Sequence, residues 1–183
     1  MKNKIKNKSF LLLVLLLVSL QNSLHAQSRE SLIKAGFIEK FTHFVEWPDI
    51  MADSDSSNTF VIKIIGKSLI GNALEDLFNS VSIKGMEVKI EYISSEEEIG
   101  SCRILFISGS ESGNLSEILK YTTGKPILTI GDTKGFGEKG VLINLFNEGN
   151  YIRYEVNKTG IEKSGLEINS LLLSYAVIIE SNG

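Results

Sequence analysis

Histidine and cysteine, which most often serve as bases, nucleophiles and soft metal ligands, are scarce in this chain of 183 residues. His43 and Cys102 are the only ones after position 26. A zinc site built from these residue types needs three or four ligands, and a serine or cysteine nucleophile needs a histidine base. We therefore expect neither. His43 is interpreted as a structural or exposed helix residue and Cys102 as a buried thiol, with an intermolecular disulfide as the alternative.

Two glycine-rich segments come close to ligand-binding motifs. GFGEKG (residues 135–140) spells the dinucleotide-binding G-x-G-x-x-G, but that motif must open a helix so that backbone amides face a pyrophosphate. Here it leads into the strand-like VLINLF. GSESG (residues 109–113) has Glu111 where the nucleophile elbow has serine. We expect the first segment to form a tight turn and the second to lack a nucleophile, and we predict no cofactor.

Carboxylates are the remaining candidates for chemistry. The run Glu96–Glu98 could bind a hard cation, although a solvated acidic face is the simpler interpretation. Glycoside hydrolysis needs a pair of carboxylates. Spacing alone does not decide whether acids such as Asp132, Glu138 and Glu155 converge to form one. No pattern positively indicates catalysis, so binding is favoured over an enzymatic function.

Residues 1–26 have the order of a secretory signal peptide. Four lysines and no acid precede an apolar run over residues 10–20, and Ala26 stands at the expected cleavage site. The apolar run is too short to span a bilayer. Removal of this segment would leave residues 27–183 as one domain and lower the net charge from −3 to −7. An acidic domain has no electrostatic footprint for nucleic acid, so we expect a periplasmic protein that neither binds nucleic acid nor spans the membrane.

The expected elements alternate between helices and strands. A helix over Glu30–Glu46 ends before Pro48, with Lys34 on its wet side and an inner side of Ile33, Phe37, Phe41 and Phe44. After a loop over Met51–Asn58, short β-branched runs predict strands at Phe60–Gly66, Val88–Ile93, Ile104–Ser108 and Pro126–Gly131. Helices are expected at Ser68–Phe78, with Leu69 on its inner face, and at Leu115–Tyr121.

The pattern changes after Gly140. Residues 141–146 and 151–156 predict a β-hairpin with a turn at Gly149-Asn150. A final helix is expected over Ile168–Glu180, where an apolar character nearly all round indicates burial against a sheet. The predicted fold is a single α/β domain: a mostly parallel sheet flanked by helices, with a C-terminal β-hairpin and a buried C-terminal helix.

Three stretches together resemble the YfiR family of periplasmic regulators. They are KAGFIEKFTHFVEWP (residues 34–48), ILFISGSES (residues 104–112) and a C-terminal block holding PILTIGDTKGFGEKGVLINLF, YIRYEVN and GLEINSLLLSYA. The resemblance implies a small α/β protein, often dimeric, that binds the periplasmic domain of a membrane diguanylate cyclase and restrains cyclic-di-GMP signalling and biofilm formation. Related domains occur joined to sensor histidine kinases. The chain departs from several relatives in having no second cysteine for Cys102, so an intramolecular redox switch is absent.

The resemblance does not mark an interface, and two sets of residues are candidates. The first set either faces a partner or, as helical spacing more often means, packs in the core; it comprises Phe37, Phe41, Phe44 and Trp47. In the second set, Asp132 and Phe136 either line a ligand pocket at the carboxyl ends of the strands or belong to a structural turn.

The function expected from these features is non-catalytic repression of a membrane signalling protein, either a cyclase or a histidine kinase. One alternative is a periplasmic sensor that binds a small molecule near Asp132. The other is an adhesion or structural accessory protein.

Overall fold

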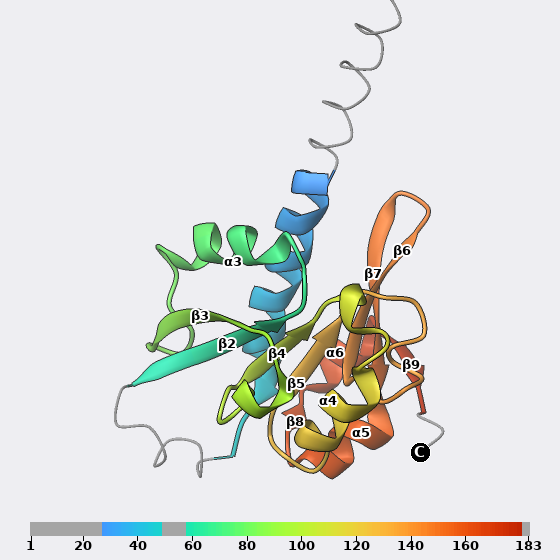
Figure 1. Cartoon of the computed structure of the whole chain (residues 1–183). Coiled ribbons are helices and arrows are strands. Elements are labelled where there is room, and N and C mark those ends of the chain that lie inside the picture. The colour runs from blue at the N-terminus through green and yellow to red at the C-terminus, as the bar shows by residue number, and fades with distance from the viewer. Residues whose placement is uncertain (1–26, 49–57, 181–183) are drawn as a thin grey trace, which may run out of the picture.

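A seven-stranded sheet forms the centre of the molecule (Figure 1). The computed structural model describes residues 27–48 and 58–180, so the export signal expected over residues 1–26 and the loop over residues 51–57 lie outside it. The strands, in spatial order, are β3 (Glu87–Ile93), β2 (Thr59–Ile65), β4 (Ile104–Ile107), β5 (Leu128–Gly131), β6 (Ile143–Glu148), β7 (Tyr151–Asn157) and β9 (Val177–Ile179). Every neighbouring pair is parallel except the hairpin of β6 and β7. The predicted strands, their mostly parallel pairing and the hairpin are confirmed.

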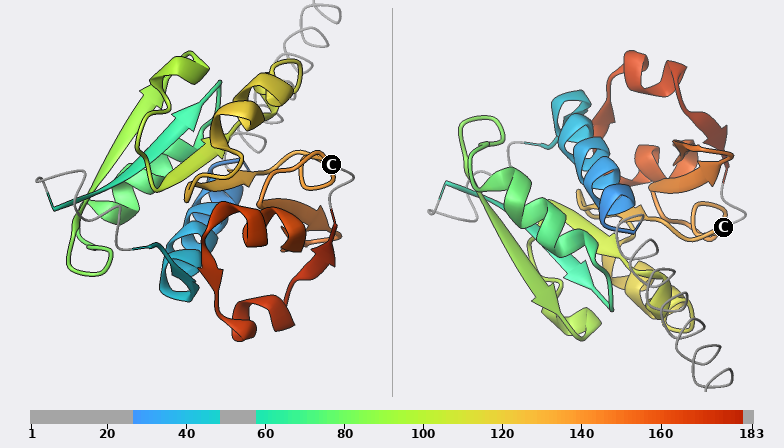
Figure 2. Two further views of the ribbon diagram at one scale, coloured as in Figure 1. Left: turned by 90° about the horizontal axis from the view of Figure 1, so that it is seen from below. Right: turned by 90° about the horizontal axis from the view of Figure 1, so that it is seen from above.

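Helices cover both faces of this sheet (Figure 2). On one face the core contains residues of the helix of residues 27–44, α3 (Ile70–Phe78), α5 (Lys158–Ser164) and α6 (Ser170–Ser174). On the other face α4 (Leu115–Thr122) packs with the short 3-10 helix η1 (Glu96–Glu98) nearby. The four residues of β4 are all buried, as expected of a strand inside a sheet covered on both faces.

The order of the strands places a topological switch point between β2 and β4. The chain leaves β2 for β3 on one side, then crosses back to β4 and continues to β5 on the other side. The connecting helices α3 and α4 consequently lie on opposite faces. Open α/β sheets bind ligands in the crevice outside the carboxyl ends of the strands at such a point.

The C-terminal helix predicted over residues 168–180 is wrong. This stretch divides into β8 (Glu167–Ile168), the five-residue helix α6 and the strand β9. β8 pairs with β1 (Val45–Glu46), which directly follows the helix of residues 27–44. The β-branched run Val177–Ile179 instead pairs in parallel with β7 and ends the sheet. Within α6 only Leu172 is buried, so this segment is not the buried helix that we expected.

Two predicted helix faces also need correction. Ile33 and Leu69 are about half exposed, whereas Ile38 and Ile70 are buried in their place. Lys34, expected in solvent, has a side chain that is only 12% exposed. Among the described residues, no helix has the length and apolar character needed to cross a membrane.

Candidate functional site

A cavity of about 620 Å³ lies at the switch point. Gly66, Ser108 and Asp132, the residues that directly follow β2, β4 and β5, all line it. The helix of residues 27–44 forms another wall through Glu30 and Lys34. The site therefore occupies the place where the fold predicts a ligand, and Asp132 lies where the sequence pattern placed it.

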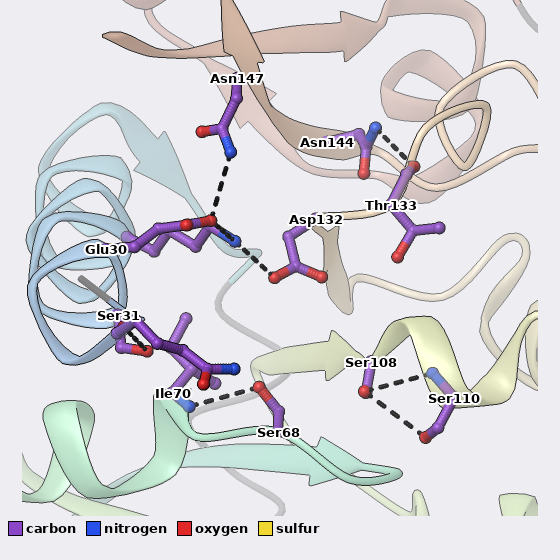
Figure 3. A network of polar contacts seen from close by, with 12 residues as sticks. Glu30, Ser31, Ser68, Ile70, Ser108, Ser110, Asp132, Thr133, Asn144 and Asn147 are labelled. Atoms are coloured by element: carbon purple, nitrogen blue, oxygen red, sulfur yellow. Dashed lines mark hydrogen bonds and ion pairs between the residues drawn. The ribbon is translucent and has the colours of Figure 1, made fainter. Parts of the chain in front are cut away.

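An ion-pair cluster joins two walls of this cavity (Figure 3). The Lys34 Nζ is 2.7 Å from Glu30 Oε1 and 2.7 Å from Asp132 Oδ2. Burial alone would lower the pKa of Lys34, but hydrogen bonds to the two carboxylates outweigh it and raise that pKa. The hydrogen bond from Lys34 lowers the pKa of Glu30. One cation thus faces two carboxylates.

The opposite wall is held by hydrogen bonds between the loops after β2 and β4. Ser108 Oγ donates to the Lys67 carbonyl oxygen at 2.5 Å, and the Lys67 backbone N–H donates to Ser110 Oγ at 2.9 Å. Across the cavity, no hydrogen bond from a described residue reaches Asp132 Oδ1, the carboxylate oxygen that does not contact Lys34. This oxygen can accept a hydrogen bond from a ligand.

The other carboxylates considered from the sequence have different surroundings. Glu155 accepts a hydrogen bond from Asn144 at 2.8 Å, while Glu138 is exposed on a neighbouring turn. Glu96–Glu98 form the 3-10 helix η1 at the surface. No group of three or more potential metal ligands occurs among the described residues.

The remaining reactive side chains lie outside the cavity. His43 is 57% exposed and pairs with Glu39 of the same helix at 2.5 Å. Cys102 is free and fully buried, and burial raises the pKa of its thiol to about 12. The prediction of a buried thiol is confirmed.

The glycine-rich segment of residues 135–140 forms successive turns. The Phe136 N–H donates to the Thr133 carbonyl and the Gly140 N–H to that of Gly137. Gly135 and Gly140 have φ angles of 82° and 119°, a region that favours glycine. The segment continues into β6 without opening a helix, so the interpretation as a turn is confirmed.

Three of the predicted aromatic residues line an apolar groove of about 420 Å³. Phe37, Phe41 and Phe44 form one wall, and β7 and α6 form the others. The Tyr154 ring packs edge-on against Phe41, with centroids 5.1 Å apart, and its hydroxyl donates to the Leu172 carbonyl. Tyr154 of β7 thus links α6 to the helix of residues 27–44.

The groove exposes apolar side chains that the sequence reasoning missed. Tyr175 is 70% exposed and Leu171 is 50% exposed, and both lie along it. Lys40 and Arg153 are its charged residues, and none of the described residues that line it is acidic. The run S-L-L-L-S-Y after the helix-capping residue Asn169 is the available signal, but its apolar character fits a buried helix equally well.

The other two candidate residues lie elsewhere. Trp47 follows β1, just after the C-terminal end of the helix, and its ring is perpendicular to that of Phe60 at 5.3 Å while Nε1 donates to the Arg103 carbonyl at 3.2 Å. Phe136 is 1% exposed and packs in the core on the α4 face of the sheet.

A family model described as YfiR/HmsC-like matches residues 31–177, which include both the cavity and the groove. The chain belongs to the YfiR/HmsC-like family. This family is one of periplasmic, non-catalytic regulatory proteins associated with cyclic-di-GMP signalling. No curated protein shows significant sequence similarity to this YfiR/HmsC-like chain.

Two solved structures are similar to the YfiR/HmsC-like chain in part. One is a conserved domain protein from Vibrio cholerae O1 biovar eltor, with 11% identity and a TM-score of 0.49, covering 65% of this chain and 54% of the other. The second is an ABC domain from Streptococcus pneumonia in complex with L-Trp, with 12% identity and a TM-score of 0.48, covering 68% of this chain and 58% of the other. The chain thus spans little more than half the length of each.

Proposed function

We propose that this protein is a periplasmic regulator that binds the exported domain of a membrane signalling protein, a diguanylate cyclase or a sensor histidine kinase, and holds it inactive. It acts by binding and catalyses no reaction. Membership of the YfiR/HmsC-like family supports this role. The observation that carries the proposal is the groove between the helix of residues 27–44, β7 and α6.

The groove has the character of a protein-binding surface. Apolar side chains exposed together, with polar residues at the rim, mark interaction sites more often than isolated surface leucines do. Tyr175 and Leu171 supply a large apolar area at the edge, and the rings of Phe37 and Phe44 lie deeper. Aromatic residues of this kind are enriched among side chains that dominate binding energies.

The charges of the groove indicate the chemistry of the partner. Lys40 and Arg153 are at least 44% exposed. Arg153 pairs with Glu148, but this pair lies in solvent, where exchange for another carboxylate changes the free energy little. We propose that the occupant is an amphipathic segment of the partner, with apolar side chains in the groove and acidic residues opposite Lys40 and Arg153.

A site-specific photo-crosslinker tests this assignment in intact cells. A crosslinking amino acid at position 175 should capture a membrane protein with a cyclase or kinase domain. The same amino acid at position 121 is the control, because Tyr121 is also exposed but belongs to α4 on the opposite face. Equal capture of the same protein from both positions would contradict a groove-specific interface.

A charge substitution tests the consequence for signalling. Leu171→Glu places a carboxylate in the groove at an exposed position, so the fold should be retained while the partner is repelled. The variant should reproduce the cyclic-di-GMP level or kinase output of a strain that lacks the protein, whereas Tyr121→Glu should behave as wild type. Full repression by the Leu171→Glu variant would contradict the proposal.

The cavity at the switch point favours a second function, that of a small-molecule sensor. We propose that Asp132 Oδ1 accepts a hydrogen bond from such a ligand, since no described residue fills this role. A ligand that binds only the folded state raises the melting temperature as its concentration increases. A thermal-shift screen should therefore find compounds whose effect disappears in Asp132→Ala, which has no side-chain acceptor, and a screen in which that variant responds like wild type would contradict the assignment.

A further inference from the structure

A third cavity, of about 170 Å³, lies away from both of these sites and shares no lining residue with them. It is enclosed by the end of α4, the turn before β6, and α5. Thr129 at the start of β5 and Asn157 at the end of the antiparallel strand β7 form part of its wall. It is therefore at the edge of the sheet opposite the carboxyl ends of β2, β4 and β5.

Asn157 contributes a buried donor that has no acceptor. Its Oδ1 accepts a hydrogen bond from the Gly160 N–H at 2.9 Å, which sets the orientation of the side-chain amide. Its Nδ2 consequently points elsewhere and has no hydrogen-bond partner, although the residue is 0% exposed. Such donors are rare in native proteins, and a bound group is one reason for their presence.

Thr129 adds a second donor beside it. Its Oγ1 accepts the Leu142 N–H at 2.9 Å, while the Leu142 carbonyl accepts the Asn157 N–H at 2.9 Å. No described acceptor takes the hydroxyl hydrogen of Thr129, which is 1% exposed. Leu142 thus bonds both to the Thr129 hydroxyl and to the backbone of Asn157, which places the two residues in one wall.

The charge of this cavity is positive in a chain whose formal net charge is −3. Lys139 and Lys163 line it, and both side chains are exposed. Neither forms an ion pair with a described residue, and no described residue in the lining is acidic. Unopposed cations beside buried hydrogen-bond donors are the arrangement that stabilises an anion with several acceptor oxygens.

We propose that this cavity binds a small oxyanion, namely a phosphate or sulfate group. Lys139 and Lys163 neutralise its charge. A small movement of the Asn157 and Thr129 side chains, which are 0% and 1% exposed in this structure, brings their donors to its oxygens. The volume is several times the roughly 30 Å³ that a water molecule occupies in the liquid, so it has room for such a group. This site does not depend on the proposed repressor function.

Calorimetric titration of the purified protein with inorganic phosphate at low ionic strength tests the proposal. One saturable site is expected, together with a melting temperature that rises with phosphate concentration. In ¹H–¹⁵N spectra the side-chain amide of Asn157 should shift as the site fills. Parallel titrations with sulfate and with glycerol 1-phosphate distinguish a site for a free oxyanion from one for a phosphate ester. The absence of saturable heat with every one of these anions would overturn the proposal.

A pair of double variants separates a specific site from general attraction. Lys139→Ala/Lys163→Ala should weaken phosphate binding by about tenfold or more, as the loss of two direct charge contacts predicts. Lys120→Ala/Lys158→Ala removes the same charge from exposed helix ion pairs and should leave the Kd within about twofold of wild type. Equal weakening in both double variants would overturn the assignment of a built site.

A third variant addresses the buried donor. Asn157→Ser keeps an oxygen that can accept the Gly160 N–H but removes Nδ2. It should lose the phosphate-dependent rise in melting temperature while retaining a cooperative transition. If the Asn157→Ser variant does not fold, Thr129→Val is the second test. This substitution removes the hydroxyl donor and should also abolish the phosphate response. An undiminished response in a folded variant would show that its donor does not contact the anion.

Discussion

Replacing Trp47 with alanine is expected to lower the free energy of unfolding by about 3 kcal/mol. Truncating a fully buried aromatic residue costs about 3–5 kcal/mol. Trp47 is only partly buried against Phe60, so we expect the loss of its packing to cost about 2 kcal/mol. Loss of the hydrogen bond from Nε1 to the Arg103 carbonyl adds about 1 kcal/mol. The cation of Lys84 lies 5.7 Å from the ring at an exposed site and contributes little.

Urea unfolding followed by far-UV circular dichroism measures this change, because Trp47 is the only tryptophan and its removal abolishes the fluorescence signal. The midpoint should fall while the m-value stays constant. Trp47→Phe is the matched control: it keeps an aromatic ring on Phe60 and should lose only about 1 kcal/mol, the share of the hydrogen bond. An alanine variant within about 0.5 kcal/mol of wild type would refute this packing argument, and simultaneous loss of partner binding would place Trp47 in an interface instead.

The other predictions concern Lys34 and Cys102. Lys34→Met should destabilise the protein by about 2 kcal/mol at pH 7 in urea unfolding, because Glu30 and Asp132 lose their shared cation in a partly buried site. The pKa of Glu30 is lowered from 4.5, so its contribution is present above that pH and is lost as the pH falls below it; a gap between wild type and variant that stayed constant from pH 7 to pH 3.5 would contradict the assignment. Cys102, whose pKa is raised to about 12, should react with a thiol reagent at pH 8 only after unfolding, and rapid reaction of the native protein would contradict its burial.

The strands β2, β4 and β5 were predictable from sequence because each one is a short apolar run that ends at, or directly before, a glycine or serine. β2, for example, ends at Ile65 before Gly66. The C-terminal region was not predictable in the same way. An apolar run such as Leu171–Ile179 satisfies both the helical and the strand pattern, and only the free edge of β7 decides that Val177–Ile179 pairs as a strand.

The candidate cavity was predictable only in part. Asp132 follows a strand of a parallel sheet, and this position alone placed it at the ligand-binding edge. Its partner Lys34 lies 98 residues earlier in the chain, on a helix whose local pattern assigned it to solvent. Periodicity describes which face of a helix is apolar, but it does not report a carboxylate that another element brings to that face.

The orientation of the helix of residues 27–44, which differs from the predicted one, explains why the groove exists. The sequence pattern placed Phe37, Phe41 and Phe44 together toward the core, but the structure centres the buried face on Ala35, Ile38 and Phe41. Neighbouring residues of a helix differ by about 100° around its axis, so this choice turns Phe37 and Phe44 toward the flank of the buried face. There they are only partly covered, because the short helix α6 meets them where a longer buried helix was expected. The aromatic set is therefore shared between two roles: Phe41 holds the helix on the sheet, and its two neighbours remain available as the wall of a binding groove.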